Sequence, residues 1–312
     1  MLATPIRTHY PLAKQALLSG KHLMVEKPLA ASSSECAEMT EIAESKGLTL
    51  MVGHTFEYNA AIRALRDIVA SGELGEIFYI DSARLNLGLF HRDVNVIWDL
   101  APHDLSIFCY VLQRDPISVS AHGAAHIQAG VHDVAFVDVT FPGNVIGNIH
   151  VSWLNPRKVR SVTIVGSKKM VVCDDIEDVE KIRIYDKGVT LPFEANQLPF
   201  ETDRFQDFHL SYRYGGITIP HVPFAEPLRT QCEHFLDCIR TGRRPQSDGR
   251  VGMKVVQLLE AADRSLRNGG AREPLVAEPA IRSAGRATAD RPAPTRTPVG
   301  AGSNGAVAHS RA

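Results

Sequence analysis

The sequence predicts an α/β domain followed by an α+β domain that has a large, mostly antiparallel sheet with helices on one face. At 312 residues the chain exceeds a comfortable single core, which favours two domains. Helical and strand patterns alternate up to about residue 53, whereas strand patterns dominate residues 76–185 and two helices follow. With 44% hydrophobic and 22% charged residues, the chain has the composition of a globular protein.

The first 53 residues show an αβαβ rhythm, which is typical of a parallel sheet. Thr8 is a candidate helix cap, with Pro11 in the first turn and Gly20 at the helix end. Ser33 precedes a second helical stretch, which runs to Lys46 and is stopped by Gly47. The expected elements are helices over 8–20 and 33–46 and short buried strands over 22–25 and 48–52.

Strand patterns separated by Pro, Gly and Asn turns dominate the second part. The expected elements are helices over 59–70, 98–112, 226–241 and 251–268, and strands that include 78–80, 134–139, 145–151 and 159–165. Beyond residue 280 the composition collapses to small, polar and Arg residues, which cannot offset their ordering entropy by burial. We therefore expect a disordered tail over 279–312; the alternative is a basic arm for an anionic partner.

Composition excludes several classes of protein. A net charge of −1 and a pI near 6.9 give no basic field for nucleic acid. No apolar run approaches the roughly 20 residues of a membrane span, and the first residues carry no secretory signal, so we expect a cytoplasmic protein. The five cysteines form no C-x-x-C, which predicts packing residues and no metal site.

Glu26-Lys27-Pro28 directly follows the buried strand over 22–25. Ligands bind at the carboxyl ends of parallel strands in open α/β sheets. A lysine there can donate a hydrogen bond to a developing alkoxide, and the proline fixes the turn. The alternative is a solvated turn with an incidental ion pair.

Trp98-Asp99-Leu100-Ala101-Pro102-His103-Asp104 opens the helix expected over 98–112. Asp99 and His103 are then i and i+4 on one face, where the carboxylate can orient the imidazole as a general base. We expect Pro102 to lie in the first turn, where proline is tolerated. The alternative is a capping aspartate with a hydrogen-bonded, partly buried histidine.

Gly53-His54-Thr55-Phe56-Glu57-Tyr58-Asn59 follows the strand over 48–52, again at a strand carboxyl end. His54 and Asn59 are placed to hydrogen-bond a polyol. Asn59 can equally serve only as the N-cap of the next helix. The residues leave both possibilities open.

These motifs occur together in the order and spacing of one family. The chain resembles, over about residues 1–275, the glucose-fructose oxidoreductase, inositol dehydrogenase and rhizopine catabolism (Gfo/Idh/MocA) family of NAD(P)-dependent oxidoreductases. The motifs that carry the resemblance are Ala3-Thr4-Pro5 with His9, Gly20-Lys21-His22, Glu26-Lys27-Pro28, Gly53-His54, the Ser71 to Ile77 turn, and Asp99 with His103.

The resemblance implies hydride transfer between the nicotinamide of NAD or NADP and a secondary alcohol of a sugar, cyclitol or nucleotide-sugar. Lys27 matches the family's catalytic lysine, and His103, supported by Asp99, matches the proton acceptor. We expect His54, Asn59 and Trp98 at the substrate. The residues matching the cofactor-binding positions are Thr4, Pro5, His9, Glu26, Lys27 and Pro28. The alternative is a catalytically silent member that binds a sugar or a partner protein.

The resemblance also implies how the domains divide the work. Residues 1–53 match the last part of the dinucleotide-binding Rossmann domain. Residues 54–278 match the substrate-binding and dimerisation domain, whose last helices pack back on the Rossmann part. We therefore expect a homo-oligomer, a dimer or tetramer, that acts on a small sugar-like molecule.

The chain departs from the family pattern at its start. No G-x-G-x-x-G turn follows a strand there, although this turn lets the backbone approach the cofactor pyrophosphate. Ala3-Thr4-Pro5 matches the end of the family's fourth strand, so strands one to three, roughly 60 residues at about 30 per βαβ unit, are expected to be missing. Either the start codon is assigned too far downstream, or the chain is a truncated product. The residue that distinguishes NAD from NADP belongs to that stretch.

Overall fold

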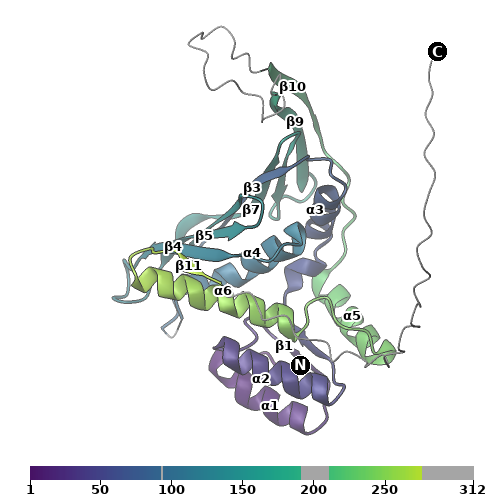
Figure 1. Cartoon of the computed structure of the whole chain (residues 1–312), viewed down its shortest axis with the longest axis vertical. Coiled ribbons are helices and arrows are strands. Elements are labelled where there is room, and N and C mark those ends of the chain that lie inside the picture. Colours follow the sequence, from purple (N-terminus) through teal and green to yellow (C-terminus); the bar gives the residue numbers. More distant parts are fainter. Residues whose placement is uncertain (93, 191–210, 276–312) are drawn as a thin grey trace, which may run out of the picture. The chain divides into compact units, whose positions relative to one another are not determined.

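The computed structural model describes residues 1–92, 94–190 and 211–275 (Figure 1). The tail expected over 279–312 lies outside the described residues. The described residues form two sheets, a parallel pair of short strands and a sheet of nine strands. The predicted fold class, α/β plus α+β, is confirmed.

The parallel pair consists of β1 (Leu23–Val25) and β2 (Leu50–Val52), which are buried along their whole length and paired in register Leu23 to Leu50. The helices α1 (His9–Leu18) and α2 (Ser33–Ser45) pack with them, so the αβαβ prediction is confirmed. Leu2 adds a parallel bridge to Val25. A 3-10 turn, η1 (Ile6–Thr8), precedes α1.

Thr8 does not cap α1 with its side chain. Its hydroxyl donates to Thr4 Oγ1 at 2.8 Å and to the Pro5 carbonyl at 2.7 Å, which closes the preceding turn instead. Helix α2 has a side-chain cap, because Ser32 Oγ accepts from the Glu35 backbone N–H. The cap is therefore Ser32, one residue before the Ser33 that the sequence pattern predicts.

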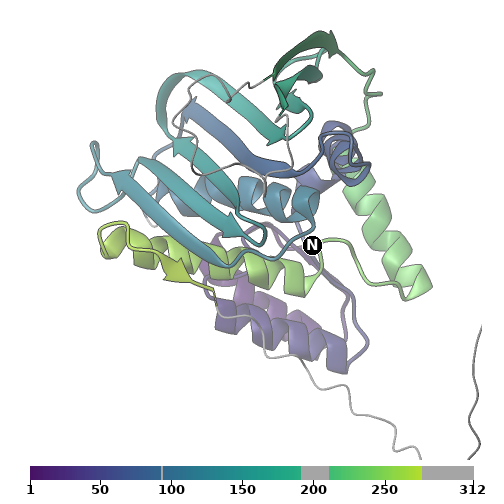
Figure 2. The same ribbon diagram turned by 45° about the horizontal axis from the view of Figure 1, so that its top comes forward.

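The large sheet is antiparallel except where β3 pairs with β6 (Figure 2). Its strand order is β10-β9-β8-β7-β3-β6-β5-β4-β11. The strands are β3 (Ile77–Leu87), β4 (Ser118–Ala124), β5 (Val134–Phe141), β6 (Val145–Ser152), β7 (Leu154–Gly166), β8 (Met170–Asp174), β9 (Ile182–Thr190), β10 (Ser211–Thr218) and β11 (Glu273–Pro274). The predicted strand segments fall within β3, β5, β6 and β7.

Helices cover one face of this sheet (Figures 1 and 2). The helices that do so are α3 (Ala60–Ala70), α4 (Val96–Leu112) and α6 (Gly249–Arg267). Along β3 the even-numbered residues from Ile80 to Arg84 are buried, so they face this helical layer. Helix α6 also packs against α2, where Val256 shares an apolar cluster with Met39.

Two elements beside β2 complete the described chain. The 3-10 turn η2 (Thr55–Tyr58) joins β2 to α3, and α5 (Pro227–Thr241) packs against it. Thr55 Oγ1 donates to Gln231 Oε1 of α5 at 2.7 Å. This contact holds the segment after β2 in place.

Helix α4 begins at Val96, not at Trp98 as expected, because Asn95 caps it through the backbone N–H groups of Ile97 and Trp98. Pro102 therefore lies in the second turn and not in the first. Its missing N–H leaves the Trp98 carbonyl without the usual partner, and its ring crowds that carbonyl. The prediction that proline occupies a tolerant end position was wrong.

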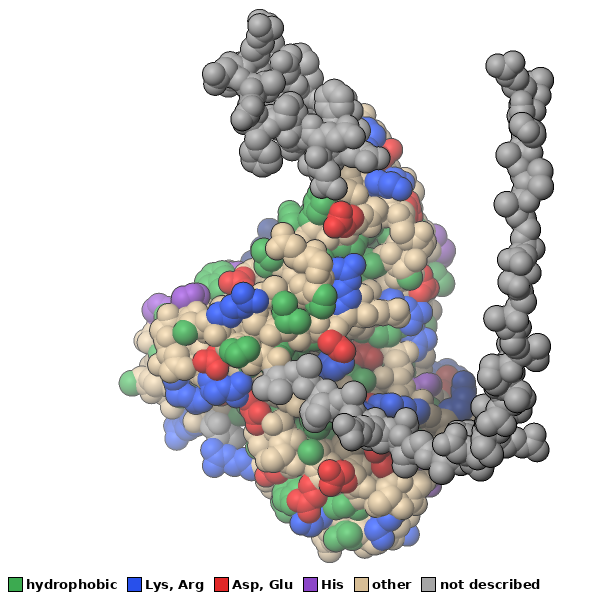
Figure 3. Space-filling view, viewed as in Figure 1, with side chains coloured by type: hydrophobic (Ala, Val, Ile, Leu, Met, Phe, Trp, Pro, Cys, Tyr) green, Lys and Arg blue, Asp and Glu red, His purple; other side chains and the backbone are tan. Residues whose placement is uncertain are grey.

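All five cysteines are free, and three of them are buried, as packing residues would be. None of the helices in the part of the chain that the structure describes is long and apolar enough to cross a bilayer. On the face shown in Figure 3, Lys and Arg side chains are interspersed with Asp and Glu.

Candidate active site

Two predicted motifs meet at one sheet edge. Because β1 and β2 are parallel neighbours, Lys27 and His54 both follow the carboxyl ends of their strands. The Lys27-Pro28 peptide bond is cis. Gly53 allows the two turns to approach, because a Cβ there would lie 2.9 Å from the Glu26 carboxylate. The two turns therefore form one wall of the candidate site.

His9 lies beneath this wall. It is 1% exposed, and its ring nitrogens lie 2.9 Å from the Pro28 carbonyl and 2.8 Å from the Thr4 carbonyl. The His9 imidazole thus joins two other residues expected at the cofactor, Thr4 and Pro28. In this arrangement His9 holds the Thr4-Pro5 turn against the turn that carries Lys27.

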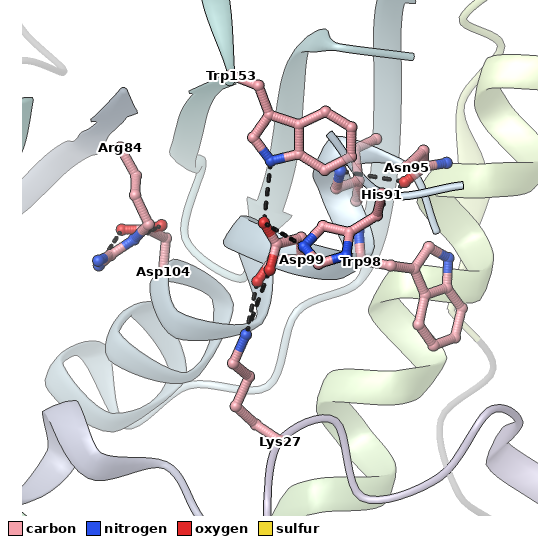
Figure 4. A network of polar contacts seen from close by, with 9 residues as sticks. Lys27, Arg84, His91, Asn95, Trp98, Asp99, Asp104 and Trp153 are labelled. Carbon is pink, nitrogen blue, oxygen red and sulfur yellow. Dashed lines mark hydrogen bonds and ion pairs between the residues drawn. The ribbon is translucent and has the colours of Figure 1, made fainter. Parts of the chain in front are cut away.

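Lys27 reaches from this wall to helix α4 (Figure 4). Its Nζ donates to the Asp99 backbone carbonyl at 2.7 Å and lies 3.8 Å from Asp99 Oδ1. The side chain is only 19% exposed. Burial lowers the Lys27 pKa from its ordinary value, and the nearby Asp99 carboxylate opposes that shift.

The carboxylate of Asp99 interacts with Lys27, Trp153 and His91 (Figure 4). Trp153 Nε1 donates to Asp99 Oδ2 at 2.9 Å, and His91 Nε2 lies 4.0 Å from the same oxygen. No hydrogen bond joins Asp99 to His103, although the two are i and i+4. The expectation that Asp99 orients the His103 imidazole is therefore not met, because Lys27 and Trp153 hold the carboxylate.

His103 is partly buried, and its ring meets the edge of Phe56 with centroids 5.0 Å apart. Its Nδ1 is buried and has no hydrogen-bond partner among the described residues. Burial, reinforced by the positive charges of Lys27 and Arg84, lowers the His103 pKa well below its ordinary value. The imidazole is therefore neutral at physiological pH and has a lone pair that can accept a proton.

His54 is fully buried, and neither ring nitrogen has a partner in the described structure. Burial, with a smaller effect from Lys27, lowers its pKa to about 3. Buried polar groups without partners are rare in folded proteins. Two such histidines near one lysine mark this region as a candidate functional site.

Two further predicted residues use their polar atoms within the fold. Asn59 Oδ1 caps α3 through the Ala61 N–H, and Asn59 Nδ2 donates to Asp175 Oδ1 at 3.0 Å. Trp98 Nε1 donates to Asp263 Oδ2 of α6 at 2.7 Å. Trp98 also lines a cavity of about 390 Å³, whose other lining residues include Ile6, Arg7 and Ala31 beside the Thr4-Pro5 turn.

Sequence reasoning missed Trp153, His91 and Arg84 (Figure 4). Arg84 makes a two-point ion pair with Asp104, at 2.7 and 3.1 Å, and its guanidinium lies 4.4 Å from the Phe56 ring centroid. Arg84 comes from β3, His91 from the loop before α4, and Trp153 from the position between β6 and β7. No local spacing links them to Lys27 or His103, and only the alternation along β3 could have placed Arg84 on the helical face.

The residues at the sheet edge fit the nicotinamide end of a dinucleotide, because Lys27 and the two unpartnered histidines offer hydrogen-bonding groups there. The Thr4-Pro5 turn and the cavity beside it continue from this edge. The chain's single G-x-G-x-x-G spacing, at Gly300, Gly302 and Gly305, lies outside the described residues.

Comparison with known proteins identifies the class. Residues 1–54 match the family model described as "Oxidoreductase family, NAD-binding Rossmann fold", and residues 62–172 match the "GFO/IDH/MocA C-terminal domain". Together the matches cover more than half of the chain. The protein belongs to the Gfo/Idh/MocA family of oxidoreductases, as the sequence motifs predicted.

The chain is similar to several dehydrogenases. UDP-N-acetylglucosamine 3-dehydrogenase of Acidithiobacillus ferrooxidans is 26% identical over 82% of this chain and 74% of its own. The scyllo-inositol 2-dehydrogenase (NAD(+)) of Bacillus subtilis is 23% identical over 86% and 75%. The structure of the WlbA dehydrogenase from Bordetella pertussis, in complex with NADH and UDP-GlcNAcA, superposes with a TM-score of 0.67 at 22% identity, covering 89% and 78%.

Proposed function

We propose that this protein is an NAD(P)-dependent dehydrogenase that oxidises a secondary alcohol of a sugar, cyclitol or nucleotide-sugar, or catalyses the reverse reduction. The observation that carries the proposal is the meeting of Lys27, Asp99 and a neutral, unpartnered His103 at the carboxyl edge of β1 and β2. Family membership and the relatives named as dehydrogenases support the same chemistry.

Each residue has a role that its surroundings allow. The bound cofactor supplies the hydride acceptor. Lys27 Nζ donates a hydrogen bond to the reacting oxygen, which stabilises the developing alkoxide. A ring nitrogen of His103 accepts the hydroxyl proton. Asp99 fixes Lys27 through its carbonyl and carboxylate, and Trp153 holds that carboxylate in position.

We propose further assignments for the ligand sites, the cofactor, the two domains and the location of the protein. His54 and the cavity beside Trp98 contribute to the ligand sites, while Thr4, Pro5, Glu26 and Pro28 border the cofactor. Either NAD or NADP is the cofactor, residues 1–53 hold its nicotinamide end, and residues 54–278 hold the substrate. The protein acts in the cytoplasm as a homo-oligomer.

The test is a substrate screen with the full chain, which follows NADH or NADPH absorbance over a panel of sugars, cyclitols and nucleotide-sugars. Turnover with at least one alcohol is expected. Lys27→Met then lowers kcat by about 100-fold or more, because it removes a hydrogen-bond donor to the developing charge. The matched control is Lys21→Met, since Lys21 is exposed and lies before β1.

Three outcomes would contradict the proposal. One is the absence of both turnover and saturable binding of NADH and NADPH. Another is saturable sugar binding without turnover, which supports a silent binding protein. The third is turnover that Lys27→Met and Lys21→Met leave equally unchanged while circular dichroism shows both variants folded.

A further inference from the structure

The imidazole of His103 has no hydrogen bond within the described residues that fixes its direction. Its Nδ1 is buried without a partner, and the Asp99 carboxylate, one turn earlier on α4, is held by Lys27 and Trp153 instead. Rotation of a histidine ring about its last side-chain bond is weakly restricted, so a ring that acts as a base needs a neighbour that holds it. The aromatic ring that contacts His103 belongs to Phe56.

Nε2 is the His103 nitrogen that a substrate can reach. Neither ring nitrogen makes a hydrogen bond in the part of the chain that the structure describes, yet Nδ1 alone is among the buried atoms without a partner. Nε2 is therefore the nitrogen open to solvent. Because a neutral imidazole accepts a proton at one nitrogen while the other carries the hydrogen, acceptance at Nε2 leaves the Nδ1–H inside the protein.

Phe56 is held on another side by a buried cation. Its ring centroid lies 5.0 Å from that of His103, with an angle of 65° between the rings, and 4.4 Å from the Arg84 guanidinium carbon. A cation over an aromatic face is attracted most strongly where water is excluded, and Arg84 is 5% exposed. Phe56 itself is half-buried and lines a cavity of about 370 Å³, so the protein does not enclose this ring on every side. The Arg84 contact therefore limits how far the ring can move.

These contacts form a loop that begins and ends on helix α4. Arg84 donates to both oxygens of Asp104, at 2.7 and 3.1 Å, which fixes the plane of the guanidinium (Figure 4). Asp104 directly follows His103 in the chain. The series Asp104, Arg84, Phe56, His103 thus links α4, β3 and η2, and the direction of the imidazole depends on all three elements.

We propose that Phe56, held by the Arg84–Asp104 pair, is a positioning residue that directs His103 Nε2 toward the hydroxyl of the bound substrate. The inference rests on the proposed dehydrogenase function and deepens it, because it names residues that act on the reaction through His103. In that reaction the hydroxyl O–H bond breaks and its proton goes to Nε2, while the hydride leaves the same carbon for the nicotinamide. Phe56 takes no part in either transfer and acts by holding the base.

The same contacts keep the imidazole neutral. Burial is the largest cause of the lowered His103 pKa, and the charges of Lys27 and Arg84 act in the same direction. If the ring turns toward solvent, its pKa should therefore rise. A variant confined to Phe56 alters none of the ionisable groups around His103. These groups are Lys27, His54, Arg84 and Arg160 from the strands and the turns after them, and Asp99 and Asp104 from α4.

The test is the variant Phe56→Leu, which keeps an apolar side chain and removes the ring. Its kcat should fall by about 10- to 100-fold with little change in KM, because a displacement of about 1 Å at a reacting group has effects of this size. Activity needs the neutral imidazole and is lost as pH falls through the His103 pKa. The acid limit of kcat/KM, which reports the base of the free enzyme, should therefore move to higher pH.

The matched control is Phe136→Leu. It removes a ring contact of the same kind, 4.2 Å from His150, on the face of the large sheet turned away from the helices, and should leave kcat and the acid limit unchanged. Phe56→Tyr keeps the ring and should recover most of the lost kcat. If Phe56→Leu does not fold, as judged by circular dichroism, the double variant Arg84→Met with Asp104→Leu decides. It leaves the Phe56 ring without its cation and should change kcat and the acid limit in the same directions.

A second readout separates this inference from the proposed function. The His103 ring is titrated by NMR in the protein without substrate, its signal being the one that His103→Gln removes. Its pKa should be higher in Phe56→Leu than in the wild type and unchanged in Phe136→Leu. If no alcohol is oxidised but this rise is seen, the proposed function fails and the positioning role stands. If turnover occurs and His103 titrates alike in Phe56→Leu and the wild type, or if Phe56→Tyr is as impaired as Phe56→Leu, the inference is overturned.

Discussion

The replacement Asp104→Asn is expected to destabilise the folded protein by about 3 kcal/mol, at the lower end of the cost of breaking a buried ion pair. The Asp104 and Arg84 side chains are 1% and 5% exposed, and their two contacts measure 2.7 and 3.1 Å. Asparagine removes the counter-charge while Arg84 stays buried. The remaining amide oxygen and the Phe56 ring face retain part of the stabilisation, which is why the lower figure applies.

The assay is urea unfolding at neutral pH, followed by fluorescence and by circular dichroism so that coincident transitions can be verified. The control is the double variant Arg84→Met with Asp104→Leu, which removes both charges. It should lie within about 1 to 2 kcal/mol of the wild type, since apolar replacement of a buried pair is often neutral. A loss below about 1 kcal/mol for Asp104→Asn would match an exposed pair and refute the reasoning.

Two further predictions concern stability. Burial raises the pKa of Glu57 from 4.5 to about 8, so between these values the folded state holds a proton that the unfolded state releases, and stability falls as pH rises. From about pH 5.5 to about 7.5 the wild type should lose up to about 2–3 kcal/mol more unfolding free energy than Glu57→Gln; parallel pH curves would contradict this. Gly252→Ala would place a Cβ 2.5 Å from Val52 Cγ2. The overpacking should cost about 1–3 kcal/mol of unfolding free energy, which exceeds the gain of about 1 kcal/mol from the higher helix propensity of alanine. The variant should therefore unfold at a lower urea concentration than the wild type, and a higher urea midpoint would show that the contact is harmless.

Much of the fold follows from local patterns in the sequence. The alternation of helix and strand up to residue 52 predicts the parallel pair, and apolar residues at helical spacing predict α3, α5 and α6 close to their observed limits. These patterns succeed because they record which face of each element is buried. The strand carboxyl ends likewise predict that the Lys27 and His54 turns lie side by side, which the pairing of β1 with β2 confirms.

The site could be predicted only in part, because spacing does not determine side-chain direction. Asp99 and His103 have the i, i+4 spacing that predicts contact, yet the Asp99 carboxylate accepts from Trp153, which lies between β6 and β7. Helix α4 begins two residues before the predicted start because Asn95 caps it, and this places Pro102 in the second turn. Long-range partners such as these depend on how the sheet and α4 pack, which no local pattern records.

Buried polar groups without hydrogen-bond partners reduce the stability of the fold, and two histidines near Lys27 carry several of them. Each buried donor or acceptor without a partner costs about 1–3 kcal/mol. His54 and His103 carry three of the six such side-chain atoms in the described residues, and the charge of Lys27 helps to lower the pKa of both. An arrangement that only stabilised the fold would pair these nitrogens with nearby carboxylates, as Arg84 is paired with Asp104. Leaving them unpaired is consistent with a site whose partners arrive with the ligand, and ligand binding then restores part of the lost stability.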